Sequence, residues 1–248
     1  MSDAIIAETV MITGHGDDTI EAYSARPVEP GRQVGGVVVI HHMPGYDEGT
    51  KEIARTFAAH GYNAVVPNLY HRDAPGASPD DAAAVARAAG GVPDDRLVGD
   101  VAGGMTYLKG LPTANGKTGV IGYCSGGRQS FLAAVSLPLD AAVDCYGAFV
   151  VGTPPEGMPL KVGPIVDRAP DLNCPLLGLF GADDKYPSPE QVAELEAALK
   201  AAGKTYEFRI YEGAGHAFFS VNRPAYHPEA AVDGWEKIFA FYGKYLAG

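Results

Sequence analysis

Residues 118–127 have the sequence TGVIGYCSGG, in which an apolar run leads directly into a Gly-x-Cys-x-Gly motif. This pattern predicts a short β-strand that turns sharply into a helix and holds the side chain of Cys124 above the edge of a sheet. Glycines are required on both sides because the turn brings backbone segments close together. Ser125 fits the motif less well, since the residue two positions before it is Tyr123 rather than glycine. The stretch therefore indicates a hydrolase with a thiol nucleophile.

Strand-like and helix-like segments alternate along the rest of the chain, which favours an α/β fold. We expect a mostly parallel central sheet with helices on both faces. Residues 5–12 and 19–25 predict an antiparallel pair of strands at the N-terminus. The remaining expected strands are 35–40, 63–67, 118–123, 141–145, 175–180 and 205–211, and the expected helices are 50–60, 79–89, 94–109, 125–135, 189–202 and 228–246. Residues 147–171 are rich in Gly and Pro and predict a long loop or small cap near the active-site edge.

Composition and charge narrow the class of protein. The chain has 248 residues, of which 46% are hydrophobic and 20% charged, as in a globular protein. Its net charge of −11 argues against nucleic acid or an anionic membrane as a partner, because either would favour a basic surface. No apolar stretch approaches the length of a membrane span, and the first residues, MSDA, do not resemble a signal peptide. We therefore expect a cytoplasmic protein with a small-molecule substrate, either a monomer or a homodimer.

The three cysteines are widely spaced along the chain. Cys124, Cys145 and Cys174 form neither a disulfide framework nor a Cys-x-x-Cys metal pattern. Cys145 and Cys174 lie in or beside apolar strands, where a free cysteine is commonly a small buried core residue. His41 and His42 are candidates for a metal pair with Cys124, but adjacent strand residues point to opposite faces, so no metal is expected.

Acidic and imidazole side chains follow two later strands. Asp183 and Asp184 follow strand 175–180, and His216 follows strand 205–211. Catalytic groups in such sheets gather at the carboxyl ends of strands, and the order nucleophile, acid, histidine is that of the α/β hydrolases. We accordingly expect residues 1–248 to form one α/β-hydrolase domain.

These groups predict a mechanism for cleaving an acyl bond. His216 would take the proton of Cys124 and later return it to the leaving group, while a carboxylate holds the imidazole in the required tautomer. The developing oxyanion needs two N–H donors. The backbone amide of Ser125 is one candidate, and that of Met43, in the loop after strand 35–40, is the other.

The chain resembles dienelactone hydrolases (carboxymethylenebutenolidases), a cysteine-nucleophile branch of the α/β hydrolases. The resemblance covers nearly the whole chain and is carried by GYCSGG at 122–127, HGYNAVVPNLY at 60–70 and GAGHAF at 213–218. It implies hydrolysis of an enol lactone or small ester by a Cys-His-Asp triad without metal or other cofactor. By position the triad is Cys124, Asp184 and His216, with Asp184 preferred to Asp183 because the family acid falls just before a short turn.

Two departures from the family pattern concern activation and substrate binding. The resemblance places His42 where the family has a glutamate that helps activate the thiol. One family arginine is matched by Arg72, whereas Ser220 stands near the position of the other, with Arg223 three residues on. Tyr123, beside the nucleophile, is a further candidate for the substrate side of the site, with packing as its alternative.

Two other functions remain open at this point. The replaced glutamate motivates a hydrolase-fold protein that binds a small ligand with little turnover. A thiol-based redox sensor is the other, although no second cysteine lies near Cys124 in the sequence.

Overall fold

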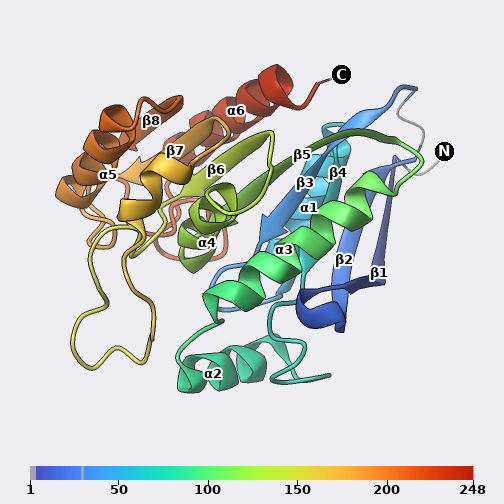
Figure 1. The fold of residues 1–248 in the computed structure, drawn as a ribbon, viewed down its shortest axis with the longest axis horizontal. Helices are drawn as coiled ribbons and strands as arrows, with labels where there is room; N and C mark the ends of the chain where they lie inside the picture. The colour runs from blue at the N-terminus through green and yellow to red at the C-terminus, as the bar shows by residue number, and fades with distance from the viewer. Residues whose placement is uncertain (1–3, 29–30, 248) are drawn as a thin grey trace.

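The computed structural model describes residues 4–28 and 31–247, and in this part of the chain eight strands form one sheet in the order β1-β2-β4-β3-β5-β6-β7-β8. The strands are β1 (Ile5–Thr13), β2 (Thr19–Pro27), β3 (Val34–Ile40), β4 (Asn63–Pro67), β5 (Ala114–Tyr123), β6 (Ala141–Cys145), β7 (Leu176–Gly181) and β8 (Tyr206–Tyr211). β1 pairs antiparallel with β2, and β2 with β4, while the strands from β4 to β8 in the sheet pair in parallel. The expected mixed α/β sheet with its N-terminal strand pair is confirmed (Figure 1).

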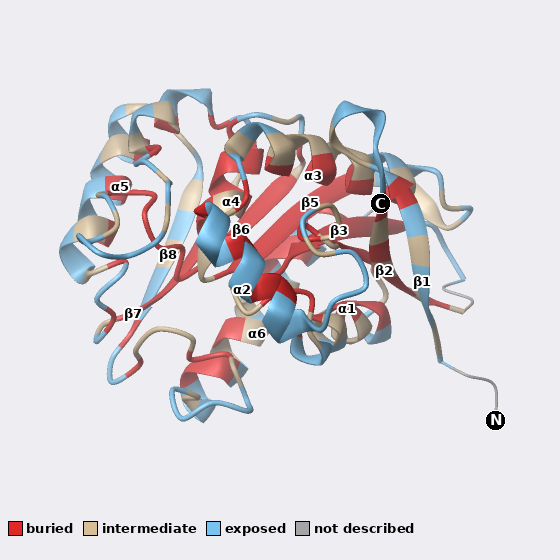
Figure 2. Ribbon diagram, turned by 90° about the horizontal axis from the view of Figure 1, so that it is seen from below, coloured by how far each residue is buried: buried red, intermediate tan, exposed pale blue. Residues whose placement is uncertain are grey.

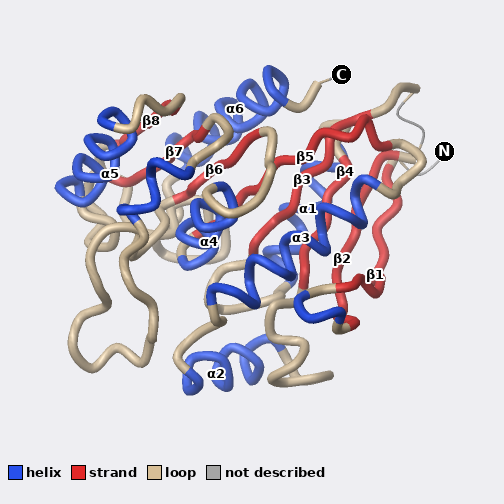
Figure 3. The backbone as a smooth tube through the Cα atoms, in the orientation of Figure 1, coloured by secondary structure: helices blue, strands red, loops and turns tan. Residues whose placement is uncertain are grey.

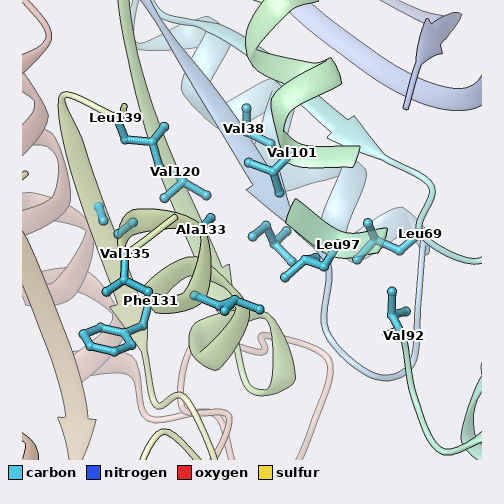
Figure 4. Close-up of a cluster of buried hydrophobic side chains, with 14 of the residues drawn as sticks. Val38, Leu69, Val92, Leu97, Val101, Val120, Phe131, Ala133, Val135 and Leu139 are labelled. Carbon is cyan, nitrogen blue, oxygen red and sulfur yellow. The ribbon is translucent and has the colours of Figure 1, made fainter. Parts of the chain in front are cut away.

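Helices cover both faces of this sheet (Figure 3). They are α1 (Glu48–Ala59), α2 (Pro79–Ala89), α3 (Asp94–Lys109), α4 (Ser125–Ala134), α5 (Pro189–Ala201) and α6 (Pro228–Tyr245), with the short 3-10 helices η1 (His15–Asp17) and η2 (Val166–Asp171). The buried side chains of α2, α3, α4 and α5 belong to one hydrophobic cluster, and those of α1 and α6 belong to a second. Figure 4 shows part of the first cluster, to which Val101 of α3, Val120 of β5 and Phe131 of α4 all contribute. The central strands are covered on both sides, as the buried ribbons of Figure 2 show.

Local sequence signals account for several helix ends. Ser188 caps α5. Its side chain accepts a hydrogen bond from the backbone N–H of Gln191, and the side chain of Gln191 accepts one from the backbone N–H of Ser188. The expected capping box is therefore confirmed. Gly61 follows the C-terminus of α1 and has a left-handed backbone conformation with φ 85°, as expected for a glycine that ends a helix. α1 begins at Glu48, two residues before the expected start, because the Asp47 side chain accepts a hydrogen bond from Thr50 N at 2.8 Å.

The segment 147–171 is a long loop that ends in η2, as its composition predicted. Figure 1 shows this loop in yellow, extending from the end of the molecule from which α2 also projects. The two segments are in contact, since Lys161 N donates to Gly90 O at 2.8 Å.

Glycines allow β3, β5 and α4 to approach one another closely. A Cβ atom at Gly122 would lie 1.8 Å from the Gly126 carbonyl oxygen, and one at Gly126 would lie 2.6 Å from the Ile40 carbonyl oxygen. Both neighbours are backbone atoms, so a larger residue would have to displace the strand or the helix that positions Cys124.

We expect Gly122→Ala to lower the free energy of unfolding by at least about 3 kcal/mol, because its methyl group must displace backbone in a packed interior. Gly243→Ala is the matched control, because Gly243 is an exposed residue of α6 and a Cβ atom added there would meet no heavy atom within 4 Å. The control should be stabilised by about 0.5–1 kcal/mol through the helix propensity of alanine. Urea unfolding followed by circular dichroism measures both, and equal effects at the two positions would contradict this account.

Candidate functional site

Cys124 lies at the turn between β5 and α4 with a backbone conformation that is rare for a residue with a side chain. Its φ is 59° and its ψ is −120°, and it stands at the N-cap of α4. The turn is fixed by hydrogen bonds from Cys124 N to Cys145 O at 3.1 Å and from Gly127 N to Cys124 O at 2.9 Å. Strain of this kind is characteristic of a nucleophile elbow.

His216 and Asp184 are brought together from the loops that follow β8 and β7. The Nδ1 atom of His216 lies 2.8 Å from Asp184 Oδ2. The Asp184 side chain is only 2% exposed, and its Oδ1 accepts a hydrogen bond from Tyr186 N at 2.9 Å. This places the Nδ1 proton on the carboxylate side of the ring and leaves Nε2 for proton exchange elsewhere. Asp183, by contrast, is exposed.

The charge state of His216 is set by two opposing influences. Burial of the ring favours the neutral form, but interactions with the Asp184 carboxylate and with Cys124 outweigh it and raise the pKa of His216 to about 10. An imidazolium is therefore favoured at neutral pH.

Met43 and Ser125, the two predicted oxyanion donors, line the same cavity as Cys124 and His216. Ser125 is the first residue of α4, where a backbone N–H has no acceptor within its own helix. The peptide of Met43 belongs to a turn in which Gly45 N donates to His42 O at 2.9 Å. Tyr70 fixes this turn from the other side, because its hydroxyl donates to Met43 O at 2.9 Å.

The two histidines that precede Met43 point in different directions. His41 is 2% exposed and lines the cavity, with Nδ1 2.9 Å from His42 O and Nε2 accepting from Leu69 N at 3.3 Å. His42 instead lies 2.9 Å from the Asp47 carboxylate at the start of α1, and among the described residues it is not part of the cavity wall. The position that the family resemblance assigned to thiol activation is thus turned away, and its neighbour faces the site.

Both hydrogen bonds of His41 suit a neutral ring that carries its proton on Nδ1. Burial lowers the pKa of His41 to about 4, even though the bond to the His42 carbonyl acts in the opposite direction. The unfolded chain, with a histidine pKa near 6.5, therefore binds this proton more readily than the folded one.

We expect His41 to make the protein less stable as the pH falls from about 6.5 to about 4. Within this window the free energy of unfolding should decrease by up to about 3 kcal/mol on account of His41 alone. The pH dependence of urea unfolding, compared between the wild type and His41→Gln, isolates this contribution because the other titrating groups are shared. Superimposable pH profiles for the two proteins would contradict a neutral His41 in the folded state.

The other residues predicted on the substrate side lie outside the cavity wall. Arg72 donates to Asp18 at 2.8 Å and to both oxygens of the fully buried Asp100 at 2.9 Å. Arg223 is exposed, and Tyr123 is buried among aromatic rings that include Tyr146 and Phe219. Within residues 4–28 and 31–247, the residues that line the cavity do not include Arg72, Arg223 or Tyr123.

The cavity has a volume of about 600 Å³ and contains several residues that sequence reasoning missed. Arg128 lies one helical turn after Cys124 on α4, a spacing that places the two on the same side of the helix. Phe149 and Leu160 come from the long loop 147–171, whose path over the site has no sequence signature.

Two further properties hold for the described part of the chain. It contains no group of three or more His, Cys, Asp or Glu side chains arranged to hold a metal ion. None of its helices is both long and apolar enough to cross a membrane.

Comparison with known proteins places this geometry in a family. The model of the dienelactone hydrolase family matches residues 20–246. An Escherichia coli K12 protein named "Putative carboxymethylenebutenolidase" is 34% identical over 252 residues, covering 98% of this chain and 89% of the relative. A Bradyrhizobium protein named "Probable 2-oxo-3-(5-oxofuran-2-ylidene)propanoate lactonase" is 28% identical over 250 residues, covering 100% and 98%.

A solved structure gives the same result in three dimensions. The crystal structure of a "Putative Dienelactone Hydrolase" from Klebsiella pneumoniae matches with a TM-score of 0.86 and 32% identity, covering 98% of this chain and 100% of the other. Since the family model spans most of the sequence and these relatives match it nearly end to end, the chain belongs to the dienelactone hydrolase family.

Proposed function

We propose that this protein hydrolyses a small carboxylic ester or an enol lactone, with Cys124 as nucleophile, His216 as acid and base, and Asp184 as the group that orients His216. The observation that carries the proposal is the 2.8 Å contact between His216 Nδ1 and Asp184 Oδ2 in the loops beside the strained Cys124. The names of the relatives, a carboxymethylenebutenolidase and a lactonase, support an ester or lactone bond as the one cleaved.

The first half of the reaction forms a thioester. The Cys124 thiolate attacks the carbonyl carbon, and the resulting oxyanion accepts hydrogen bonds from the backbone amides of Ser125 and Met43. When the carbonyl re-forms, the C–O bond breaks and the departing oxygen takes the proton of His216. For a lactone, that alcohol or enol remains attached to the acyl group.

The second half returns the enzyme to its starting state. A water molecule attacks the thioester while His216 accepts one of its protons, and the C–S bond breaks to release a carboxylic acid. The thiolate is restored beside a protonated His216, so no other reactant is consumed.

The proposal is tested by offering a panel of small esters and enol lactones and quenching the reaction in acid. We expect several turnovers per molecule of protein and a mass increase equal to the acyl group on the peptide that contains Cys124. Ligand binding with no turnover on any member of the panel would favour the small-ligand binding protein instead. Turnover without acylation of Cys124 would reject the thioester route.

A further inference from the structure

We infer that the acid part of the substrate is apolar and uncharged, so that the cavity selects esters of apolar carboxylic acids over substrates with a free carboxylate. The inference rests on the proposed function and specifies its substrate class. It also sets this chain apart from the Bradyrhizobium relative, whose name describes a propanoate.

Arg72, which matches one of the two family arginines, is held away from the cavity. Arg72 contacts both oxygens of Asp100, the carboxylate of Asp18 and the carbonyl oxygen of His15. Asp100 is fully buried, so withdrawing the guanidinium would leave an unpaired charge in the interior. Arg72 is therefore a structural ion-pair residue and does not turn toward the cavity.

The buried arginine that lines the cavity is paired with another carboxylate. Arg128 is 3% exposed, and its two terminal nitrogens donate to the Asp94 carboxylate at 2.8 and 3.0 Å. One of them donates in addition to Gly163 O at 2.9 Å. The charge of this guanidinium is thus already paired with Asp94, although its buried Nε has no hydrogen-bond partner among the described residues.

Most of the surface that lines the cavity is apolar, and apolar side chains contribute a large part of it. They come from four separate segments and include Met43, Leu69, Val92, Phe149, Leu160 and Val162. Leu69, Val92 and Phe149 are buried. A carboxylate transferred to such a surface loses its hydration without gaining a partner, whereas each methylene gains from the transfer.

The cation of His216 at the cavity is paired with the Asp184 carboxylate, and the remaining charged groups do not favour an anion. Arg87 and Lys185 contribute to its lining but are exposed residues, where attraction to a carboxylate is screened by water and salt. The carboxylates of Asp183 and Asp184 contribute to the same lining.

The test compares two para-nitrophenyl esters of nearly equal size, the heptanoate and the hydrogen adipate, which differ in whether the chain ends in an ethyl group or a carboxylate. We expect kcat/KM for the heptanoate to exceed that for the adipate by at least about tenfold, and the neutral methyl adipate ester to recover most of the loss. Along the acetate, butanoate and hexanoate esters, kcat/KM should rise by up to about fourfold per methylene. Equal or faster cleavage of the hydrogen adipate would overturn the inference.

A binding measurement separates this inference from the proposed function. Calorimetry with the two corresponding para-nitroanilides, which resist cleavage, should show at least about tenfold tighter binding of the heptanoic derivative. That result supports the apolar cavity even if no ester is turned over, and the reverse order of affinities overturns it.

Two variants locate the discrimination. Leu160→Arg, which adds a cation to the apolar wall, should reduce the heptanoate-to-adipate ratio by at least about fivefold, while its control Leu160→Met should leave the ratio unchanged. Arg87→Ala should also leave it unchanged. A selective loss of adipate cleavage in Arg87→Ala would show that the rim arginine binds the carboxylate and would count against the inference.

Discussion

Replacement of Cys124 by alanine is expected to reduce kcat at least about ten-thousand-fold on any ester or lactone that the wild type cleaves. Loss of a covalent nucleophile removes the entire thioester route, and in comparable triads it costs nearly as much as removing all members together. The substitution removes one sulfur atom from a partly exposed position, so the free energy of unfolding should change little. Steady-state assays and urea unfolding measure the two effects separately.

Cys174→Ala is the matched control for this experiment. Burial raises the pKa of Cys174 to about 12, so its sulfur stays protonated and unreactive under the same conditions. Iodoacetamide should therefore label Cys124 in the wild type and in the Cys174 variant alike, with activity lost in step with labelling. Retention of more than a tenth of the wild-type kcat in Cys124→Ala would reject the cysteine as nucleophile.

Asp184→Asn is expected to reduce kcat by about one hundred- to ten-thousand-fold. The amide can no longer stabilise an imidazolium and can hold the ring in the wrong tautomer. Because the Asp184 carboxylate helps to raise the pKa of His216 to about 10, the variant should titrate at lower pH, toward the ordinary histidine value near 6.5. Imidazole resonances followed by NMR report this shift independently of turnover.

Asp183→Asn provides the comparison, because the two aspartates are neighbours and only Asp184 bonds to His216. The exposed residue 183 should tolerate the change with less than about a threefold effect on kcat and no shift in the His216 titration. If both substitutions caused similar losses, the acidic member of the triad would have to be reassigned.

Much of the fold was accessible from the sequence because its signals are local. Ser188 followed by proline at the first helical position predicted the start of α5, and the glycines around Cys124 predicted a sharp turn. In each case the relevant partner lies within a few residues, so composition at one place determines geometry at the same place.

The substrate side of the site was not accessible in this way because it depends on distant partners. Arg72 is fixed by residues 54 and 28 positions away in the chain, Asp18 and Asp100. His41 and His42 directly follow β3, and a shift of one residue there would exchange the directions in which their side chains point. The sequence around them contains no signal that tells which of the two lines the cavity. Only the folded chain shows that His41 lines the cavity while His42 contacts Asp47.

Arg128 links the helix that follows Cys124 to two other segments at the cavity wall. Its guanidinium, on α4, donates hydrogen bonds to Asp94 in the first turn of α3 and to the carbonyl oxygen of Gly163 in the 147–171 loop. Grafting the 147–171 loop of a relative into this protein would therefore transfer selectivity only if the graft also presented a carbonyl oxygen to Arg128, as Gly163 does here. The wall of the cavity therefore depends on the loop, Arg128 and Asp94 together, rather than on the loop alone.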